Sequence, residues 1–116
     1  MTQINRVGEA TVVRLDRLYE SLDPRSLGAL RDVLLREADA AQPPYVVIDF
    51  TATEMFGSSF IEVLFRAYKR LKQRDGRMVL CGLNPFCLEV LRATRLDSLW
   101  AIYPSETAAV EAVLAA

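Results

Sequence analysis

The chain has 116 residues, of which 52% are hydrophobic and 25% are charged, and its formal net charge is −1. This length predicts one folded domain, residues 1–116, and the composition excludes disorder, which needs low hydrophobicity and high net charge. Without an excess of Lys and Arg, the chain has no broad electrostatic attraction for nucleic acid. Histidine is absent, which excludes Ser-His and Cys-His catalysis, and two cysteines alone cannot complete a zinc site. We expect no metal and no cofactor.

The N-terminal residues are polar where a secretory signal would be apolar. No later stretch reaches the roughly 18 uninterrupted apolar residues of a membrane span. We therefore expect a cytoplasmic protein without direct membrane insertion. Cys81 and Cys87 fall in an expected strand and an expected helix, and they give no sign of a disulfide framework, so buried reduced thiols are expected.

The first predicted elements are two strands. Residues 10–16 form a short run rich in β-branched side chains, which predicts a strand, and residues 4–7 are its expected hairpin partner across Gly8. A turn is expected next, over the residues RLYESLDP, which end in Asp23 and Pro24.

The first helix is predicted to begin at this turn and to run to about Ala41. Asp23 supplies a side-chain acceptor for free N–H groups, and Pro24 has the backbone angle that a first helical residue needs. One face of this helix is expected to be buried, because apolar residues recur at helical spacing. They are Leu27, Leu30, Leu34 and Ala38.

The middle of the chain predicts a central strand and a second helix. Residues 45–50, YVVIDF, are continuously apolar up to Asp49, as expected for a strand covered on both faces. Residues 51–56 are expected to be irregular. Residues 58–74 predict a helix that ends at Asp75 and Gly76, because one of its faces is apolar. That face comprises Ile61, Leu64, Phe65, Tyr68 and Leu71.

The last part of the chain alternates in the same way. Residues 77–81 predict a strand, Asn84 and Pro85 predict the cap and first turn of a helix to about Thr94, and a strand and a helix are expected over 99–103 and 105–114. The fold class is therefore α/β. We expect a mixed, mainly parallel sheet of four to five strands with about four helices packed against it.

The segment that leaves the central strand and enters the second helix is the favoured functional position in such folds. A helix N-terminus offers unpaired N–H groups and the positive end of the helix dipole, so a phosphate on Ser58 would be favoured there. The alternative is that Ser58 or Ser59 simply caps the helix, and spacing alone favours the cap because serine is common at that position.

The stretch from VVIDFTATEMFGSSFIEVLF to RATRLDSLWAIYPS resembles the core of STAS domains, especially bacterial anti-sigma factor antagonists. The upstream segments ATVVRLD and ESLDPRSLGALRDVL also resemble this family. The resemblance implies a mixed sheet flanked by helices and a serine phosphorylated by an anti-sigma factor kinase, and Ser58 matches that position. It also implies that an acidic residue before the first helix lies beside the acceptor, and Asp23 matches it.

The chain departs from the family motif Asp-Ser-Ser/Thr/Ala-Gly on both sides of the serine pair. Gly57 stands where the motif has Asp, and Phe60 stands where it has Gly. We expect both changes to alter the surface that the kinase docks on. The expected partner-binding residues are Asp23, Met55, Phe56, Gly57, Ser58, Ser59 and Glu62.

Other conspicuous side chains have two interpretations each. Trp100 and Tyr103 are predicted to pack on the last strand rather than to stack on a ligand. The second helix is basic, and its charges either engage an acidic partner surface or form a solvated face suited to the end of a helix. The basic residues are Arg66, Lys69, Arg70, Lys72 and Arg74.

The sequence thus favours a binding module over an enzyme. The first hypothesis is an anti-sigma factor antagonist that binds an anti-sigma factor or switch kinase and is regulated through Ser58. The second is a non-switching STAS scaffold or regulatory subunit, in a signalling assembly or with a lipid-transport ATPase. The third, an enzyme or small-ligand binder, lacks both a nucleophile-base pair and a glycine-rich phosphate loop.

Overall fold

The structure of the protein is a computed structural model that describes residues 2–15, 18–19 and 24–115. Strands and helices alternate along most of this length. In chain order the elements are β1 (Gln3–Val7), β2 (Ala10–Arg14), β3 (Leu18–Tyr19), α1 (Pro24–Ala40), β4 (Tyr45–Asp49), β5 (Met55–Phe56), α2 (Ser58–Gln73), β6 (Arg77–Cys81), α3 (Pro85–Ala93), the 3-10 helix η1 (Leu96–Ser98), β7 (Ile102–Tyr103) and α4 (Glu106–Leu114).

Five strands form one mixed sheet in the order β1-β2-β4-β6-β7. β1 pairs antiparallel with β2 through the predicted hairpin, and the other neighbours pair in parallel. In the register of the sheet, Val47 on β4 lies between Val12 on β2 and Val79 on β6. The α/β class, the mainly parallel sheet and the central position of β4 are confirmed.

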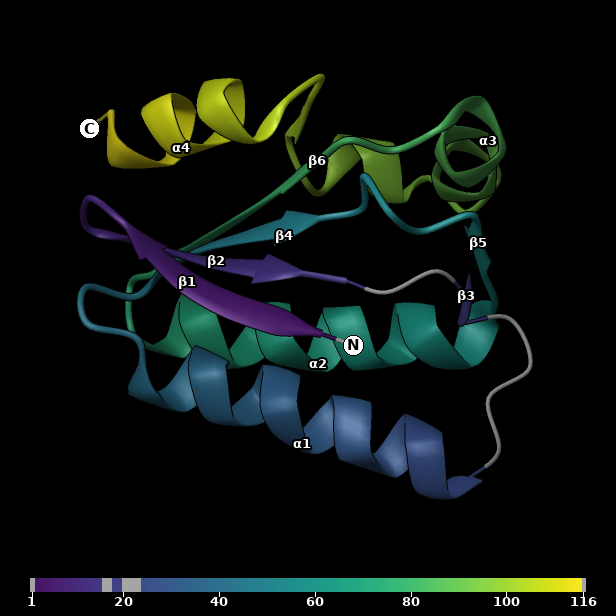
Figure 1. The fold of residues 1–116 in the computed structure, drawn as a ribbon, viewed down its shortest axis with the longest axis horizontal. Coiled ribbons are helices and arrows are strands. Elements are labelled where there is room, and N and C mark those ends of the chain that lie inside the picture. The colour runs from purple at the N-terminus through teal and green to yellow at the C-terminus, as the bar shows by residue number, and fades with distance from the viewer. Residues whose placement is uncertain (1, 16–17, 20–23, 116) are drawn as a thin grey trace.

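Helices cover both faces of the sheet, as Figure 1 shows: α1 and α2 lie below it and α4 lies above it. The two faces carry separate buried clusters. Val46 and Ile48 face the cluster that includes α1 and α2, whereas Val47 faces the cluster under α4. This double coverage explains why the sequence of β4 is continuously apolar rather than alternating.

Two arginines near the end of α2 fasten it to α1. Arg74 donates to the carbonyl oxygens of Ala38 at 2.8 Å and of Ala41 at 2.7 Å. These carbonyls belong to the end of α1, where helical carbonyls lack intrahelical partners. Arg70 pairs with Asp39 at 2.6 Å. These contacts join the C-terminal ends of the two helices.

A small second sheet was not predicted. β3 and β5 pair in parallel, with Leu18 opposite Met55 and Tyr19 opposite Phe56. Residues 51–56 were expected to be irregular, and the residues before α1 were expected to be a turn. Two-residue strands carry too few side chains for an alternating pattern to show. The pairing places the chain that leads toward α1 beside the chain that leads into α2.

The prediction of a strand over residues 99–103 is wrong for its first half. The backbone N–H groups of Leu99 and Trp100 donate to the carbonyl of Leu96 at 3.0 and 3.1 Å, so they continue the turn of η1 instead of joining the sheet. Only Ile102–Tyr103 forms β7. Trp100 is buried, as expected of a packing residue, with its ring edge-on to Tyr68.

Gly82, just after β6, yields a first testable prediction. Its φ is +71°, and an added Cβ would lie 2.9 Å from Asp49 Oδ1 and closer still to Thr51 Oγ1. Gly82→Ala is therefore expected to lower the free energy of unfolding by more than about 1 kcal/mol, measured by urea denaturation.

Gly28→Ala is the matched control for that substitution. Gly28 lies within α1, and an added Cβ would meet only Arg31, at an ordinary 3.7 Å. It is expected to stabilise the protein by about 0.5 to 1 kcal/mol, because alanine favours the helix. Equal effects of the two substitutions would contradict this account of Gly82.

Candidate functional site

Ser58 is the first residue of α2, and neither it nor Ser59 caps the helix. The cap position belongs to Gly57, which is extended with φ −111° and ψ −176° and makes no side-chain cap hydrogen bond. Its carbonyl accepts from the N–H groups of Phe60 and Ile61, both at 3.2 Å. The prediction that one of the serines caps the helix is therefore wrong, and both side chains are exposed.

The N-terminus of α2 provides an electrostatic setting for an anion. The first N–H groups of a helix have no intrahelical partner, and the helix dipole is positive at this end. The first turn of α2 contains no acidic residue. Glu62 is the nearest carboxylate on the helix, one turn along, and it is exposed. A group of negative charge on the Ser58 hydroxyl would be favoured by the backbone alone.

Three aromatic rings on either side of this position in the chain pack against one another. The ring centroid of Phe56 lies 5.4 Å from that of Phe50 and 5.8 Å from that of Phe60, and Phe50 and Phe60 are 6.2 Å apart. All three side chains are buried. The expectation that Phe60 alters the docking surface is wrong, because its ring points into the core. Phe56 likewise positions the surface from beneath and does not present its side chain there.

Polar contacts hold the segment between β4 and β5 in place. Asn84 Nδ2 donates to the carbonyl of Glu54 at 2.9 Å, while Asn84 Oδ1 accepts from the N–H of Cys87 at 2.8 Å. The Thr53 N–H donates to the carbonyl of Phe50 at 2.9 Å. Asn84 thus caps α3, as predicted, and also ties the segment before Ser58 to that helix. Sequence reasoning missed the second role, because no local pattern reports such a distant contact.

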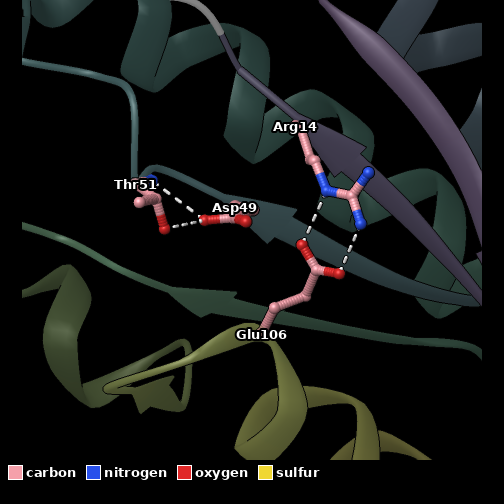
Figure 2. A network of polar contacts seen from close by, with 4 residues as sticks. All are labelled: Arg14, Asp49, Thr51 and Glu106. Carbon is pink, nitrogen blue, oxygen red and sulfur yellow. Dashed lines mark hydrogen bonds and ion pairs between the residues drawn. The ribbon is translucent and has the colours of Figure 1, made fainter.

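The same segment is fixed at its start by Asp49, the last residue of β4. Asp49 Oδ1 accepts from the backbone N–H of Thr51 at 2.9 Å and from its hydroxyl at 2.6 Å. Figure 2 shows this turn beside a second contact, in which Arg14 on β2 meets Glu106 at the start of α4 with two hydrogen bonds, of 2.7 and 2.8 Å. The pair joins α4 to the sheet at the end from which the candidate site extends.

These contacts and burial shift the pKa values of three nearby groups. The hydrogen bonds from Arg14 lower the pKa of Glu106, although partial burial opposes the effect. Burial, together with the neighbouring Asp49, raises the pKa of the Cys81 thiol to about 12, and burial also raises the pKa of Cys87. Both cysteines are free and buried. They are therefore neutral thiols near pH 7 and lack the thiolate that reactive cysteines need.

The predicted partner-binding residues lie together only in part. Met55 and Gly57 are half-buried, whereas Ser58, Ser59 and Glu62 are exposed. These five residues are called the acceptor surface below. Asp23 lies outside the described residues. Sequence reasoning missed β3, because its partner Met55 is far away along the chain and the pairing is apparent only in three dimensions.

In residues 2–15, 18–19 and 24–115, the Cys, Asp and Glu side chains form no group of three that could hold a metal ion. Across the same ranges, none of the helices has both the length and the apolar character needed to cross a bilayer.

Comparison with known proteins gives consistent results. The family model described as "STAS domain" matches residues 1–109. The chain is 26% identical over 98 residues to an anti-sigma F factor antagonist of Paenibacillus polymyxa, covering 84% of each chain. It is similar to the solved structure of an anti-sigma-factor antagonist (STAS) domain protein from Planctomyces limnophilus, with 33% identity, a TM-score of 0.86 and 97% of both chains covered. An anti-sigma factor antagonist from Mycobacterium paratuberculosis has 26% identity and a TM-score of 0.82, with 97% of this chain and 92% of that chain covered.

The double role of Asn84 is testable with two variants. Asn84→Asp keeps the acceptor that caps α3 but loses the donor to Glu54, so we expect a loss of about 1 kcal/mol and faster amide exchange over residues 53–57. Asn84→Ala loses both contacts, so we expect a loss of about 2 kcal/mol and faster exchange in α3 as well. Urea denaturation and hydrogen exchange measure the two effects. Unchanged exchange over residues 53–57 in both variants would refute the tie.

The contact between Arg14 and Glu106 predicts a pH dependence. Because the pKa of Glu106 is lowered in the folded state, its stabilisation is complete above the ordinary value of about 4.3 and is lost as the pH falls through the folded pKa. Glu106→Gln should therefore be less stable than wild type at pH 7, and the difference should shrink on acidification. Glu111→Gln, an exposed site on the same helix, is the control. A difference that does not change with pH would contradict the assignment.

Proposed function

The chain belongs to the STAS domain family, and from this premise we propose that it is an anti-sigma factor antagonist whose partner is an anti-sigma factor with serine kinase activity. Phosphorylation of Ser58 by that partner would weaken the complex, and the unphosphorylated form would release a sequestered sigma factor. In this proposal residues 1–116 form one STAS domain that acts in the cytoplasm as a binding protein and catalyses no reaction. The names of its relatives support the general role.

The observation that carries the proposal is the state of Ser58. Its side chain is exposed, and it is the first residue of α2. Gly57 occupies the cap position, so the Ser58 hydroxyl does not cap the helix. A hydroxyl that neither caps the helix nor packs in the core is accessible to a kinase. The surroundings are held in place by the aromatic rings below and by Asn84, so the acceptor is presented from a defined backbone.

The proposed contact region is the acceptor surface, joined by Asp23 on the strength of the family resemblance. Phe56 supports this contact region from the core, because its side chain is buried. Gly57 leaves no side chain where the family motif has Asp, so the partner meets the backbone at this point. Phe60 is no obstacle to docking, since it is fully buried.

A phosphate on Ser58 would act on the partner rather than on the fold. It adds about −1.5 to −2 charge units. Arg66, the first basic residue of α2, is eight residues on, about 12 Å along the axis and beyond reach of direct pairing. Glu62 is closer and of like charge. The partner would therefore meet a phosphate that α2 does not neutralise. When one event weakens another through a coupling of this kind, the binding affinity typically changes about 5- to 150-fold.

A second candidate is a non-switching STAS scaffold or regulatory subunit, in a signalling assembly or with a lipid-transport ATPase. The substitution of Gly57 for the motif's Asp favours it, because the carboxylate beside the acceptor is missing. The burial of Phe60 removes the other argument for it. An enzyme is the least supported hypothesis, since among the described residues no hydrogen bond joins the Ser58 hydroxyl to a base that could activate it.

Phosphorylation is tested by intact mass. The protein is incubated with ATP and each candidate anti-sigma factor kinase of the organism that encodes it, and the mass is compared among wild type, Ser58→Ala and Ser59→Ala. We expect one phosphate on wild type and on Ser59→Ala, and none on Ser58→Ala. Because Ser58 does not cap α2, the free energy of unfolding of Ser58→Ala should lie within about 0.5 kcal/mol of the wild-type value.

The alternative outcomes are informative. A stable complex whose mass and affinity do not change with ATP would support the scaffold. A phosphate that persists in Ser58→Ala would refute the assignment of the acceptor. Turnover of a substrate lost on Ser58→Ala would revive the enzyme hypothesis.

A further inference from the structure

The exposed face of α2 carries a line of side chains that begins at Ser58. Successive members are four, three, four and three residues apart, which places them along one side of a helix. All are exposed. The line is called the α2 stripe and consists of Ser58, Glu62, Phe65, Lys69 and Lys72. At 1.5 Å per residue, it extends about 21 Å from the candidate acceptor.

The basic residues of α2 divide into two groups. Arg70 and Arg74 are engaged with α1, by an ion pair to Asp39 and by hydrogen bonds to carbonyl oxygens. Within the described residues, no ion pair is formed by Arg66, Lys69 or Lys72. The fold therefore accounts for the first group and leaves the second directed to solvent, next to the stripe or on it.

Phe65 is the unusual member of the stripe. Its side chain is 40% exposed although α2 already buries Phe60, Val63, Leu64, Ala67 and Leu71 against the core. The Phe65 ring lies 6.4 Å from the ring of Tyr68, and the Lys69 ammonium is 5.8 Å from its centroid. An exposed aromatic ring with cations beside it matches the general layout of interfaces, in which aromatic side chains anchor the centre and polar groups form the rim.

A stable interface is also larger than the acceptor surface alone. Specific complexes bury about 800 Å² on each partner, from 20 to 30 residues. The acceptor surface contributes five residues, so a partner seated over Ser58 must extend across neighbouring elements. The α2 stripe continues from Ser58 without a break and offers exposed apolar area in that direction.

We propose that the recognition surface of this protein runs along the α2 stripe, and that the partner opposes it with an apolar pocket for Phe65 and with acidic side chains for Lys69 and Lys72. This inference rests on the proposed function, because the partner is the anti-sigma factor that binds at Ser58. The occupant is an acidic protein surface rather than nucleic acid, since three free cations on a chain of net charge −1 form no phosphate-tracking patch.

The stripe separates the switch from the attachment. Ser58 and Glu62 occupy one end and Lys69 and Lys72 the other, and Ser58 and Lys69 are about 16 Å apart along the axis. That distance is about two Debye lengths at physiological ionic strength. A phosphate on Ser58 therefore leaves the lysine contacts in place. Phosphorylation weakens the complex at one end, while Phe65 and the lysines continue to bind at the other.

The test measures association and dissociation rates with the anti-sigma factor kinase that phosphorylates or binds wild type in the preceding experiment. Lys69→Glu is expected to slow association about 3- to 10-fold at low salt, with the difference shrinking at high salt. Phe65→Ala is expected to speed dissociation about 10- to 30-fold with little change in salt dependence. Circular dichroism checks that both variants remain folded.

Two matched controls lie elsewhere on the molecule. Arg6→Glu makes the same change of charge on the exposed edge strand β1, and Leu114→Ala truncates an equally exposed apolar residue at the end of α4. Both should bind like wild type. If Lys69→Glu and Phe65→Ala also match wild type, the stripe is refuted while the proposed function stands.

Other outcomes overturn more or different parts. If wild type binds none of the candidate kinases, both the proposed function and the stripe fall. If Lys69→Glu instead loses binding to phosphatidylserine vesicles that wild type holds, while kinase binding is unchanged, the stripe serves a membrane and the protein-partner inference is wrong.

Discussion

The packing of Phe50, Phe56 and Phe60 against one another is the constraint on which the rest of the site depends. Phe50 follows the central strand, Phe56 lies on β5 and Phe60 lies in the first turn of α2. Their rings are buried within 5.4 to 6.2 Å of each other. Burial of aromatic rings is among the largest single contributions to a core. It brings three consecutive segments to one point, and the start of α2 is fixed by that packing.

Polar contacts complete what the rings begin. The rings fix where the segment before Ser58 lies, and hydrogen bonds to its backbone hold the course of the chain there. Asn84 supplies one of these bonds from another helix, and Asp49 shapes the turn at the start. The acceptor surface is thus held both by apolar burial and by hydrogen bonds. Neither alone would define both position and direction.

The sequence predicted the elements whose burial shows in a local pattern of apolar residues. The apolar run of β4 and the one-sided helix α2 were found because their periodicity reflects burial directly. The strand at 99–103 was partly wrong, since Trp100 is buried on a helical turn just as it would be on a strand. The pairing of β3 with β5 and the second role of Asn84 involve residues about 30 or more apart, so no local window contains them.

Gly57 lets α2 begin without a side-chain cap. A serine at the cap position, just before a helix, commonly uses its side chain to hold the first turn together, so that such a serine is committed to the fold. Here a residue without a side chain occupies the cap, and the first turn is held by backbone carbonyl contacts and by Phe60 in the core. Position 58 is consequently free to change in evolution. A lineage can gain, lose or replace a hydroxyl there without having to compensate elsewhere in the chain for a weakened helix.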